Sequence, residues 1–306
     1  MPDTRRDERP ADHDVVIVGG GPAGSSAGVF TGRYGLNTAV FDRGSAALPR
    51  CAFLENYPGF PGGIDVGTFQ DLLADHVETA GCDRVEETVD SVRRAASDAR
   101  FVVETAAGRT VTAEYVLAAA WYDGAYLRPL VGEGAFEVHE HHGESHERFD
   151  PAYADADGRT AVDGLYVAAP AGDRNAQVIV AAGHGAHVAR SLLEDVRSSR
   201  GYPDGVAAHY DWLRPAAEFE GEWGDRDRWR EWFDTEAAGA TDVSEDRLET
   251  LRTAEIDRAF ETKRSTEPVE RLTESGQKRL LEHLDDEHIR AYLEATDGAG
   301  AGPESS

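Results

Sequence analysis

A glycine-rich turn that follows a short apolar run constrains the fold of this chain more than any other feature. The run is Val15 to Val18, and its β-branched residues predict a strand buried on both faces of a parallel sheet. The chain then enters the pattern Gly19-x-Gly21-x-x-Gly24 and continues into residues typical of a helix. Gly19 permits a tight turn, Gly21 lets the backbone approach a pyrophosphate, and Gly24 lets the helix lie close to the strand. The turn therefore predicts a dinucleotide site at the helix N-terminus.

A second apolar run places an acid where a ribose would need one. Thr38 to Phe41 is followed by Asp42, close to the ~20-residue offset at which such an acid binds a ribose hydroxyl. Arg43 is adjacent, but no neighbouring motif would neutralise Asp42 for a 2′-phosphate. The alternative is an ordinary glycine-rich turn without a ligand. The order of strand, turn, helix, strand and acid favours the dinucleotide.

The acidic composition limits the partners that this chain can have. Its 306 residues suffice for one large domain or two ordinary ones, and the formal net charge is −27. Such a charge repels nucleic acid and anionic membranes, so we expect neither as a partner. Lys263 and Lys278 are the only lysines. The pattern is typical of a halophilic protein in a salt-rich cytoplasm, and a merely acidic mesophilic protein is the alternative.

Segments for membrane insertion, secretion or disulfide bonding are not predicted. No run reaches the ~18 apolar residues of a membrane helix, and residues 1–12 read as a polar, disordered tail rather than a signal peptide. The two cysteines, Cys51 and Cys82, have no CxxC or metal-type spacing. We therefore expect a cytoplasmic protein without a structural disulfide.

Secondary structure can be predicted for the region that follows. A proline- and glycine-rich loop over residues 54–65 precedes an amphipathic helix from about Val66 to Ala80, which Gly81 is placed to end. The apolar face of that helix would comprise Phe69, Leu72, Leu73, His76 and Val77. Strand-like stretches then alternate with turns, and the middle two are predicted to form a hairpin. The four predicted strands are Arg84–Val92, Phe101–Thr105, Thr110–Thr112 and Tyr115–Ala120.

Several motifs together resemble the low-molecular-weight thioredoxin reductase family of FAD-dependent pyridine nucleotide-disulfide oxidoreductases. They cover roughly residues 13–195 and comprise GGGPAG at 19–24, ENYPGFPGGID at 55–65, the segment 127–133, DGRTAVDGLYVAAPAGD at 157–173 and QVIVAAGHGA at 177–186. The resemblance implies an α/β fold, namely a three-layer, Rossmann-like FAD-binding domain with a β-meander. It implies FAD-binding halves at 13–130 and 158–200, joined by a connector at 131–157.

The resemblance also implies a role for individual residues. Gly19, Gly21 and Gly24, with Pro22 and Ala23 in the same turn, would bind the FAD pyrophosphate. Asp42, with Arg43 beside it, would meet the adenosine ribose, and Asn56 would lie beside the flavin. Asp173, preceded by Gly172, would bond the ribityl or pyrophosphate region, although a turn aspartate is an equal alternative. Gln177 and the backbone around Val178 would face the polar edge of the flavin.

The chain departs from the family where the redox relay would be. Family members insert an NADPH domain and a CxxC between the two FAD halves, whereas about 25 residues join them here, too few for a second βαβ unit. The stretch Ala118-Ala-Ala-Trp121 also stands where the family usually has Ala-Thr-Gly. We therefore expect a FAD-binding oxidoreductase that receives electrons from diffusing NAD(P)H or a partner protein, with dimerisation implied by the family. The alternative is a non-catalytic, nucleotide-binding regulatory protein.

Two further features could carry chemistry. Cys51 could act as a one-cysteine redox partner of the flavin, or it could be a small buried hydrophobic residue. The segment 138–147 could bind a transition metal, but a solvated connector is favoured and no metal site is predicted. Its histidines are His139, His141, His142 and His146.

The C-terminal third is predicted to be a helical extension over 201–297, followed by a tail over 298–306. Residues 201–211 read as a linker, and Ser244 is a plausible N-cap for a helix. A second helical pattern runs from Val269 to Leu293 and would end at Gly298. We expect these helices to form a small bundle that either packs on the flavin domain or mediates self-association. The aromatic cluster at 218–233 is interpreted as core rather than a substrate cage.

Overall fold

The structure is a computed structural model, and it describes residues 11–44, 47–96, 99–120, 123–141, 144–168, 177–209, 212–239 and 243–300. The chain divides into two compact units, Met1–Leu193 and Glu194–Ser306, and each is described by itself.

The first unit is built on a mixed sheet in which the described strands follow the order β3-β2-β1-β6-β5-β4, with β9 also paired to β6. Strands β1, β2, β3, β6 and β9 are parallel, whereas β4 and β5 are antiparallel. The strand bounds are β1 (His13–Val18), β2 (Thr38–Phe41), β3 (Asp83–Val85), β4 (Val89–Arg94), β5 (Phe101–Thr105), β6 (Thr110–Ala118) and β9 (Leu165–Val167).

Three of the four strand predictions are wrong in their bounds. The predicted strand Arg84–Val92 is divided, because β3 pairs with β2 at one edge of the sheet and β4 pairs with β5 at the other. The chain therefore crosses between the two edges at residues 86–88. The predicted strands Thr110–Thr112 and Tyr115–Ala120 form the single strand β6. Its first half pairs with β5 and its second half with β1 and β9, so one strand serves both the meander and the parallel sheet.

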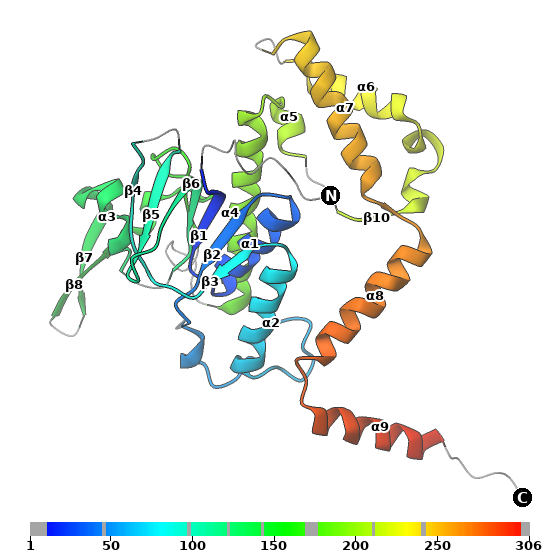
Figure 1. Cartoon of the computed structure of the whole chain (residues 1–306), viewed down its shortest axis with the longest axis horizontal. Coiled ribbons are helices and arrows are strands. Elements are labelled where there is room, and N and C mark those ends of the chain that lie inside the picture. The colour runs from blue at the N-terminus through cyan, green and yellow to red at the C-terminus, as the bar shows by residue number, and fades with distance from the viewer. Residues whose placement is uncertain are drawn as a thin grey trace, which may run out of the picture. The chain divides into compact units, whose positions relative to one another are not determined.

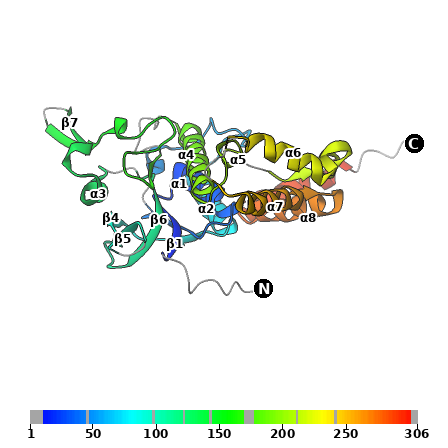
Figure 2. The ribbon, with the colours of Figure 1, turned by 90° about the horizontal axis from the view of Figure 1, so that it is seen from above.

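Helices cover one side of the parallel strands, and β4 and β5 lie on the other, which gives the predicted three layers (Figures 1 and 2). These helices are α1 (Pro22–Arg33), α2 (Val66–Thr79) and the first part of α4 (Val178–Ser199). The predicted bounds of α2 are confirmed. Asp65 caps it by accepting a hydrogen bond from the Thr68 amide at 2.9 Å, and Gly81 follows its end with a φ of +91°.

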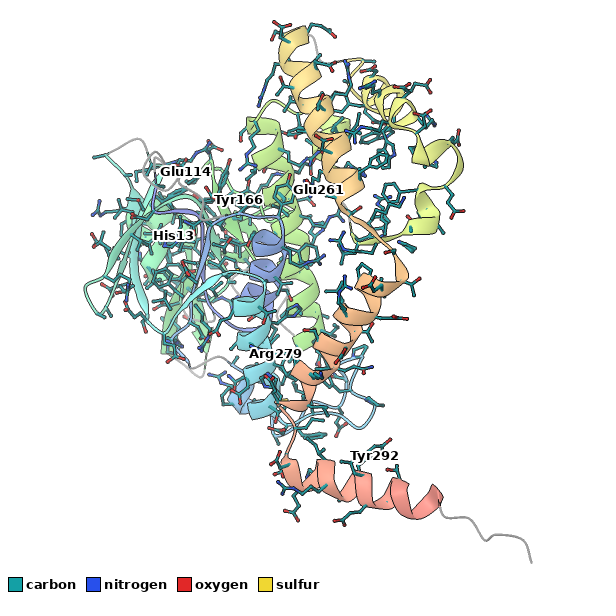
Figure 3. The ribbon with its side chains drawn as sticks, turned by 45° about the vertical axis from the view of Figure 1, so that its right-hand side comes forward. His13, Glu114, Tyr166, Glu261, Arg279 and Tyr292 are labelled. Carbon is teal, nitrogen blue, oxygen red and sulfur yellow. The ribbon has the colours of Figure 1, made fainter. Side chains whose placement is uncertain are left out.

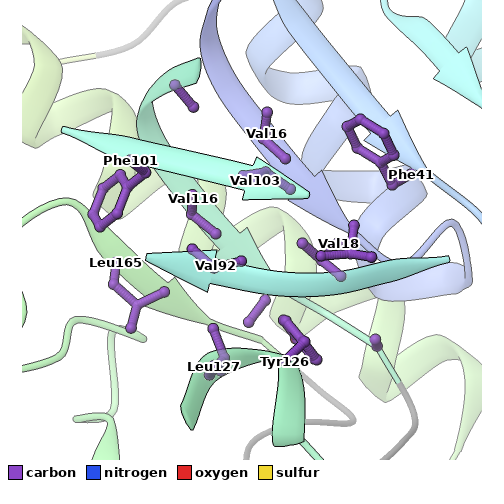
Figure 4. Close-up of a cluster of buried hydrophobic side chains, with 14 of the residues drawn as sticks. Val16, Val18, Phe41, Val92, Phe101, Val103, Val116, Tyr126, Leu127 and Leu165 are labelled. Atoms are coloured by element: carbon purple, nitrogen blue, oxygen red, sulfur yellow. The ribbon is translucent and has the colours of Figure 1, made fainter. Parts of the chain in front are cut away.

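The core of the first unit lies between the parallel strands and the meander, as Figure 4 shows. Val16 and Val18 of β1 and Phe41 of β2 pack there against residues of β4, β5 and β6. Val15 and Ile17 are fully buried as well. Strand β1 is therefore buried on both faces, as its β-branched run predicts.

The N-terminal edge of the unit is held by Asp12, a residue of the segment predicted as a tail. Its carboxylate accepts hydrogen bonds from the Thr112 amide and hydroxyl, both at 2.8 Å. The backbone hydrogen bond from Thr112 is the main cause of the lowered pKa of Asp12. Residues 1–10 lie outside the described part of the chain.

The segment predicted as a connector contains a β-hairpin. Short helices η3 (Ala125–Leu127), α3 (Arg128–Val131) and η4 (Glu133–Ala135) lead to β7 (Phe136–His141) and β8 (Glu144–Phe149), which pair antiparallel, and η5 (Pro151–Tyr153) follows. His139 stands opposite His146 in this register. The side chains of His139 and His141, and all of His142, lie outside the described residues. Among those described, no group of three or more metal-ligating side chains gathers.

The second unit has its own core around three helices. These are α5 (Asp204–Ala207), which forms within the predicted linker, α6 (Arg226–Glu236) and α7 (Glu245–Glu261). Val206, Phe233 and Leu251, one from each helix, are buried together. The hydroxyl of Ser244 accepts a hydrogen bond from the Arg247 amide at 3.4 Å, which confirms the predicted cap of α7.

The last part of the chain forms two helices rather than one packed segment. They are α8 (Thr266–Leu281) and α9 (Asp286–Gly300), so Gly298 does not end the second helix. The Asp285 carboxylate accepts a hydrogen bond from the Glu287 amide at 2.7 Å, which favours a new helix start there. Leu272, Leu280 and Leu284 are more than half exposed within the single chain, and self-association through this stretch stays a prediction. Figure 3 labels Arg279 on α8 and Tyr292, also exposed, on α9.

Candidate dinucleotide site

The turn between β1 and α1 has the geometry that its glycines predict. Gly19 has a φ of +112°, and a Cβ atom there would lie 2.7 Å from the carbonyl oxygen of Ala119. A Cβ atom on Gly24 would lie 1.7 Å from the carbonyl oxygen of Gly19. The Gly19 amide also donates to the Phe41 carbonyl at 2.8 Å. Side chains at either glycine would therefore push the helix away from the ends of the strands.

The N-terminus of α1 is suited to an anion. Gly21 is its N-cap and has no side chain that could cap the helix, and Pro22 follows at the first helical position. The first backbone N–H groups of a helix have no partner within that helix, and the helix dipole makes them attractive to negative charge. The amides of Ala23 and Gly24 belong to this set. A phosphate or pyrophosphate is the group that such a turn binds.

Asp42 lies at the end of β2 with hydrogen bonds to both carboxylate oxygens. Oδ1 accepts from the Gly44 amide at 2.9 Å, and Oδ2 accepts from Nη2 of Arg84 at 3.1 Å. A Cβ atom on Gly20 would lie 2.4 Å from the Asp42 Cβ, so Gly20 lets the turn pass beside this carboxylate. Asp42 is thus held next to the glycine turn, where the ribose of a dinucleotide would lie.

Arg84 was not predicted from the sequence. It also donates to Glu86 at 2.6 Å. Burial by itself would lower the pKa of Arg84, but hydrogen bonds and charge interactions with Glu86 and Asp42 raise it above its ordinary value. Arg84 therefore remains a cation beside Asp42, whereas the sequence neighbour Arg43 is exposed.

Asn56 and Gln177, which are 121 residues apart in sequence, are joined in the structure. Nδ2 of Asn56 donates to Oε1 of Gln177 at 2.9 Å. The loop that carries Asn56 is closed by paired backbone hydrogen bonds between Leu54 and Ile64, both at 2.9 Å. Val178 packs against the apolar cluster under this loop. The two segments predicted to flank the flavin therefore meet.

Helix α4 also contacts the glycine turn directly. A Cβ atom on Gly185 would lie 2.0 Å from the carbonyl oxygen of Ala23, so only glycine allows this approach of α4 to α1. The contact places the two halves of the predicted site against each other. Gly172, Asp173 and Trp121 lie outside the described residues.

The two cysteines are free and differ in their surroundings. Cys51 is exposed, and its Sγ lies 3.5 Å from the Phe53 carbonyl oxygen, so its interpretation as a buried hydrophobic residue is wrong. Cys82 is buried between α1 and the end of α2, and its thiol donates to the Gly28 carbonyl at 3.1 Å. Burial and the charge of Asp83 raise the pKa of Cys82 to about 11. Cys82 is therefore a neutral, packed thiol.

A cavity of about 540 Å³ lies next to α4, at the hairpin formed by β7 and β8. Glu137 and Arg148 of the hairpin, Asp150 and Asp155 of the following loop, and His184 of α4 line it. Sequence reasoning did not single out Arg148 or His184. Their shared cavity depends on where the hairpin folds, which local sequence patterns do not encode.

Known proteins are similar to this chain over part of its length. No protein-family model matches the chain. It is 33% identical over 129 residues to a bifunctional thioredoxin reductase/thioredoxin of Mycobacterium leprae, covering 40% of this chain and 28% of that protein. It is 35% identical over 79 residues to the thioredoxin reductase of Aquifex aeolicus, covering 25% of this chain and 24% of that protein. The chain thus spans about a quarter of the length of these two relatives.

A solved structure shows the same fold. A thioredoxin reductase from Gloeobacter violaceus superposes with a TM-score of 0.50 at 17% identity, covering 66% of this chain and 98% of that one. The resemblance read from the sequence motifs is confirmed at the level of the family. In sequence over part of its length, and in fold, this chain is therefore similar to the thioredoxin reductases.

Proposed function

We propose that the first unit binds FAD and that the protein is an FAD-dependent oxidoreductase. The observation that carries the proposal is the hydrogen bond between Asn56 and Gln177, since it joins the two segments that would flank the flavin. The contact of Gly185 with Ala23 supports it, because it brings the second segment onto the pyrophosphate turn.

The residues present fit the parts of FAD. The amides at the start of α1 would hold the pyrophosphate, and the carboxylate of Asp42 would accept from the ribose hydroxyls. Oδ1 and Oδ2 of Asp42 retain acceptor capacity beyond their bonds to Gly44 and Arg84, since each carboxylate oxygen has two lone pairs. Asn56 and Gln177 would present amide groups to the polar edge of the ring. Bound FAD would supply electron transfer, while the protein orients it and tunes its surroundings.

We do not propose that this chain reduces a protein disulfide through a dithiol of its own. Cys51 and Cys82 are the two cysteines of the sequence, and Cys82 is buried with a raised pKa. Thiol–disulfide exchange needs an accessible thiolate, which Cys82 does not offer. Cys51 is exposed and keeps its candidate role as a single redox thiol.

The electron donor would be diffusing NAD(P)H or a partner protein. The cavity beside His184 is a candidate entry for a small donor or substrate, because it lies at the helix whose start would face the flavin. Arg148 could pair with an anionic group of that molecule, whereas Glu137, Asp150 and Asp155 disfavour a strongly anionic one. We also propose a cytoplasmic location. The structure adds that no described helix has the length and apolarity to cross a bilayer.

The absorption spectrum of the purified protein tests the proposal. We expect flavin bands, either as purified or after adding FAD, and their loss when Gly24→Val displaces the turn. Gly134→Val, at a glycine of the first unit with nothing within 4 Å of its Cβ position, controls for general damage by valine. A folded wild-type protein that takes up no FAD would contradict the proposal.

Anaerobic mixing with NADH or NADPH separates the enzyme from the regulatory alternative. Bleaching of the flavin band, followed by turnover with an electron acceptor, supports an oxidoreductase. Flavin that stays oxidised with every donor favours a nucleotide-binding regulator. The Cys51→Ser variant then shows whether the exposed thiol takes part, because only a redox role would lower turnover while leaving FAD content unchanged.

A further inference from the structure

The second unit contains an aromatic cavity that the proposed flavin site does not use. It has a volume of about 500 Å³ and lies among η6 (Ala216–Phe219), η7 (Gly221–Gly224), α6 and β10 (Arg214–Pro215). The elements are yellow and green in Figure 1. The side chains that matter for its chemistry are His209, Arg214, Phe219, Trp223, Trp229 and Trp232, and Glu218 and Glu220 also line it.

The aromatic wall of this cavity is held in place. Trp229 is 5% exposed, and its indole N–H donates to the Trp223 carbonyl at 2.9 Å. Its ring centroid lies 5.2 Å from that of Trp223 and 5.9 Å from that of Trp232, both in edge-to-face geometry. Trp223 and Trp232 are only partly buried. They therefore offer ring surface to the cavity at little further cost in side-chain entropy.

Arg214 supplies a positive charge at this wall. Strand β10 pairs with β11 (Lys263–Arg264), and the Arg214 amide donates to the Thr262 carbonyl at 3.0 Å, which fixes the start of the side chain. Only 14% of that side chain is exposed. Among the described residues, Nε is buried without a hydrogen-bond partner, and Oε2 of Glu218 lies 3.8 Å from Nη1. A largely covered guanidinium whose Nε has no partner favours an anion in the cavity.

A second polar group, His209, is held by a hydrogen bond to a buried carboxylate. Nδ1 of His209 lies 2.9 Å from Oε1 of Glu255, and Arg197 donates to Oε2 of Glu255 at 2.8 Å. Burial alone would raise the pKa of Glu255, but the hydrogen bond from His209 and the charge of Arg197 hold it below its ordinary value. Glu255 is therefore ionised and accepts a hydrogen bond from Nδ1 of His209, so the other ring nitrogen, Nε2, remains for a ligand.

We propose that this cavity binds a small planar aromatic carboxylate. The ring would stack on Trp223 or Trp232, the carboxylate would pair with Arg214, and His209 would supply a second polar contact. A cationic ligand is disfavoured, because Arg214 lines the cavity and the guanidinium of Arg228 already lies 4.7 Å from the Trp223 centroid.

Isothermal titration calorimetry on the full chain, with indole-3-carboxylate, indole and tetramethylammonium, tests this proposal. We expect the carboxylate to bind at least tenfold more tightly than indole, and tetramethylammonium to show no binding. Arg214→Gln should abolish the preference for the carboxylate without weakening indole. Arg230→Gln on α6 is the matched control, because that arginine is exposed and pairs with Asp227 at 2.8 Å outside the cavity.

Glu218→Gln gives an independent test if Arg214→Gln does not fold. Glu218 is half exposed and competes for Arg214, so its neutralisation should tighten carboxylate binding several-fold. Binding of tetramethylammonium in preference to the carboxylate would overturn the proposal, as would binding of none of the three probes. An unchanged carboxylate affinity in both Arg214→Gln and Glu218→Gln would also overturn it. None of these measurements depends on the flavin.

Discussion

Asp42 has a structural role beside its proposed role in ribose binding. Its carboxylate holds the loop after β2 through Gly44 and pairs with Arg84, and it lies where a ribose would be bound. A charged acceptor in such a position contributes more than a neutral one, because hydrogen bonds to ionised groups are about twice as strong. The charge of Asp42 is therefore expected to matter more than its shape.

The isosteric change Asp42→Asn tests this expectation. We expect it to weaken FAD binding by about 10- to 100-fold, the equivalent of roughly 1.5–3 kcal/mol for a charged hydrogen bond. Fluorescence titration of apoprotein with FAD measures the change. Asp83→Asn, at an exposed position of the neighbouring strand, is the control and should leave the affinity unaltered. Equal affinities for wild type and Asp42→Asn would remove Asp42 from the site.

Because Cys82 is buried, the free energy of unfolding is expected to fall at alkaline pH. Its folded-state pKa is raised to about 11 from an ordinary value of 9.0, mainly by burial. The unfolded thiol ionises first, so the stability from the neutral buried thiol is complete below about pH 9 and is lost as the pH rises toward 11. The loss should be on the order of 2 kcal/mol.

Urea denaturation at pH 8 and pH 10.5 measures this effect. The Cys82→Ala variant should lose less stability between the two pH values than wild type, because other titrating groups are common to both proteins. Identical losses would show that the thiol does not govern the alkaline transition.

At the scale of elements, α4 depends on two glycines with opposite requirements. Gly185 faces Ala23 of α1 with no room for a Cβ atom, whereas Gly183, two residues earlier, has nothing within 4 Å of its Cβ position. Both lie in the same helix, so their helix propensities are comparable. Their substitution separates the packing requirement from propensity.

Gly185→Ala should destabilise the first unit by about 1–3 kcal/mol through overpacking, and it should lower FAD occupancy. Gly183→Ala should instead be neutral or stabilising by up to about 1 kcal/mol, because alanine favours the helix. Thermal denaturation and flavin content measure both effects. Equal behaviour of the two variants would mean that α1 and α4 do not meet as described.

At the scale of the whole molecule, the net charge of −27 opposes the compact state. Many of the described ion pairs are exposed arginine–carboxylate pairs, such as Arg93 with Glu104 and Arg109 with Glu87, which individually contribute little. Screening of the overall repulsion is thus expected to matter more for stability than any single pair.

Salt should therefore stabilise the protein. Raising NaCl from about 0.01 M to 1 M shortens the Debye length from about 30 Å to about 3 Å. We expect the urea midpoint to rise by on the order of 1 M, the equivalent of a few kcal/mol. Sucrose at the same osmolality is the uncharged control and should produce a smaller increase. A midpoint that falls or stays constant in NaCl would contradict this expectation.

The sequence alone was sufficient for features that depend on short-range patterns. The turn from β1 to α1, the bounds and cap of α2, and the cap of α7 at Ser244 follow from neighbouring residues, because caps and turns are set by local hydrogen bonds and backbone preferences. The resemblance to thioredoxin reductases also rests on short motifs, and the relatives bear it out.

Only the tertiary structure decided which distant residues meet. The pairing of Arg84 with Asp42, of Asn56 with Gln177, and of Glu255 with His209 depends on strand order and helix packing. The division of residues 84–92 between opposite sheet edges and the exposed leucines of α8 have the same origin. A periodic pattern shows which face of an element is apolar, but the partner that covers that face is set by contacts between residues far apart in the chain.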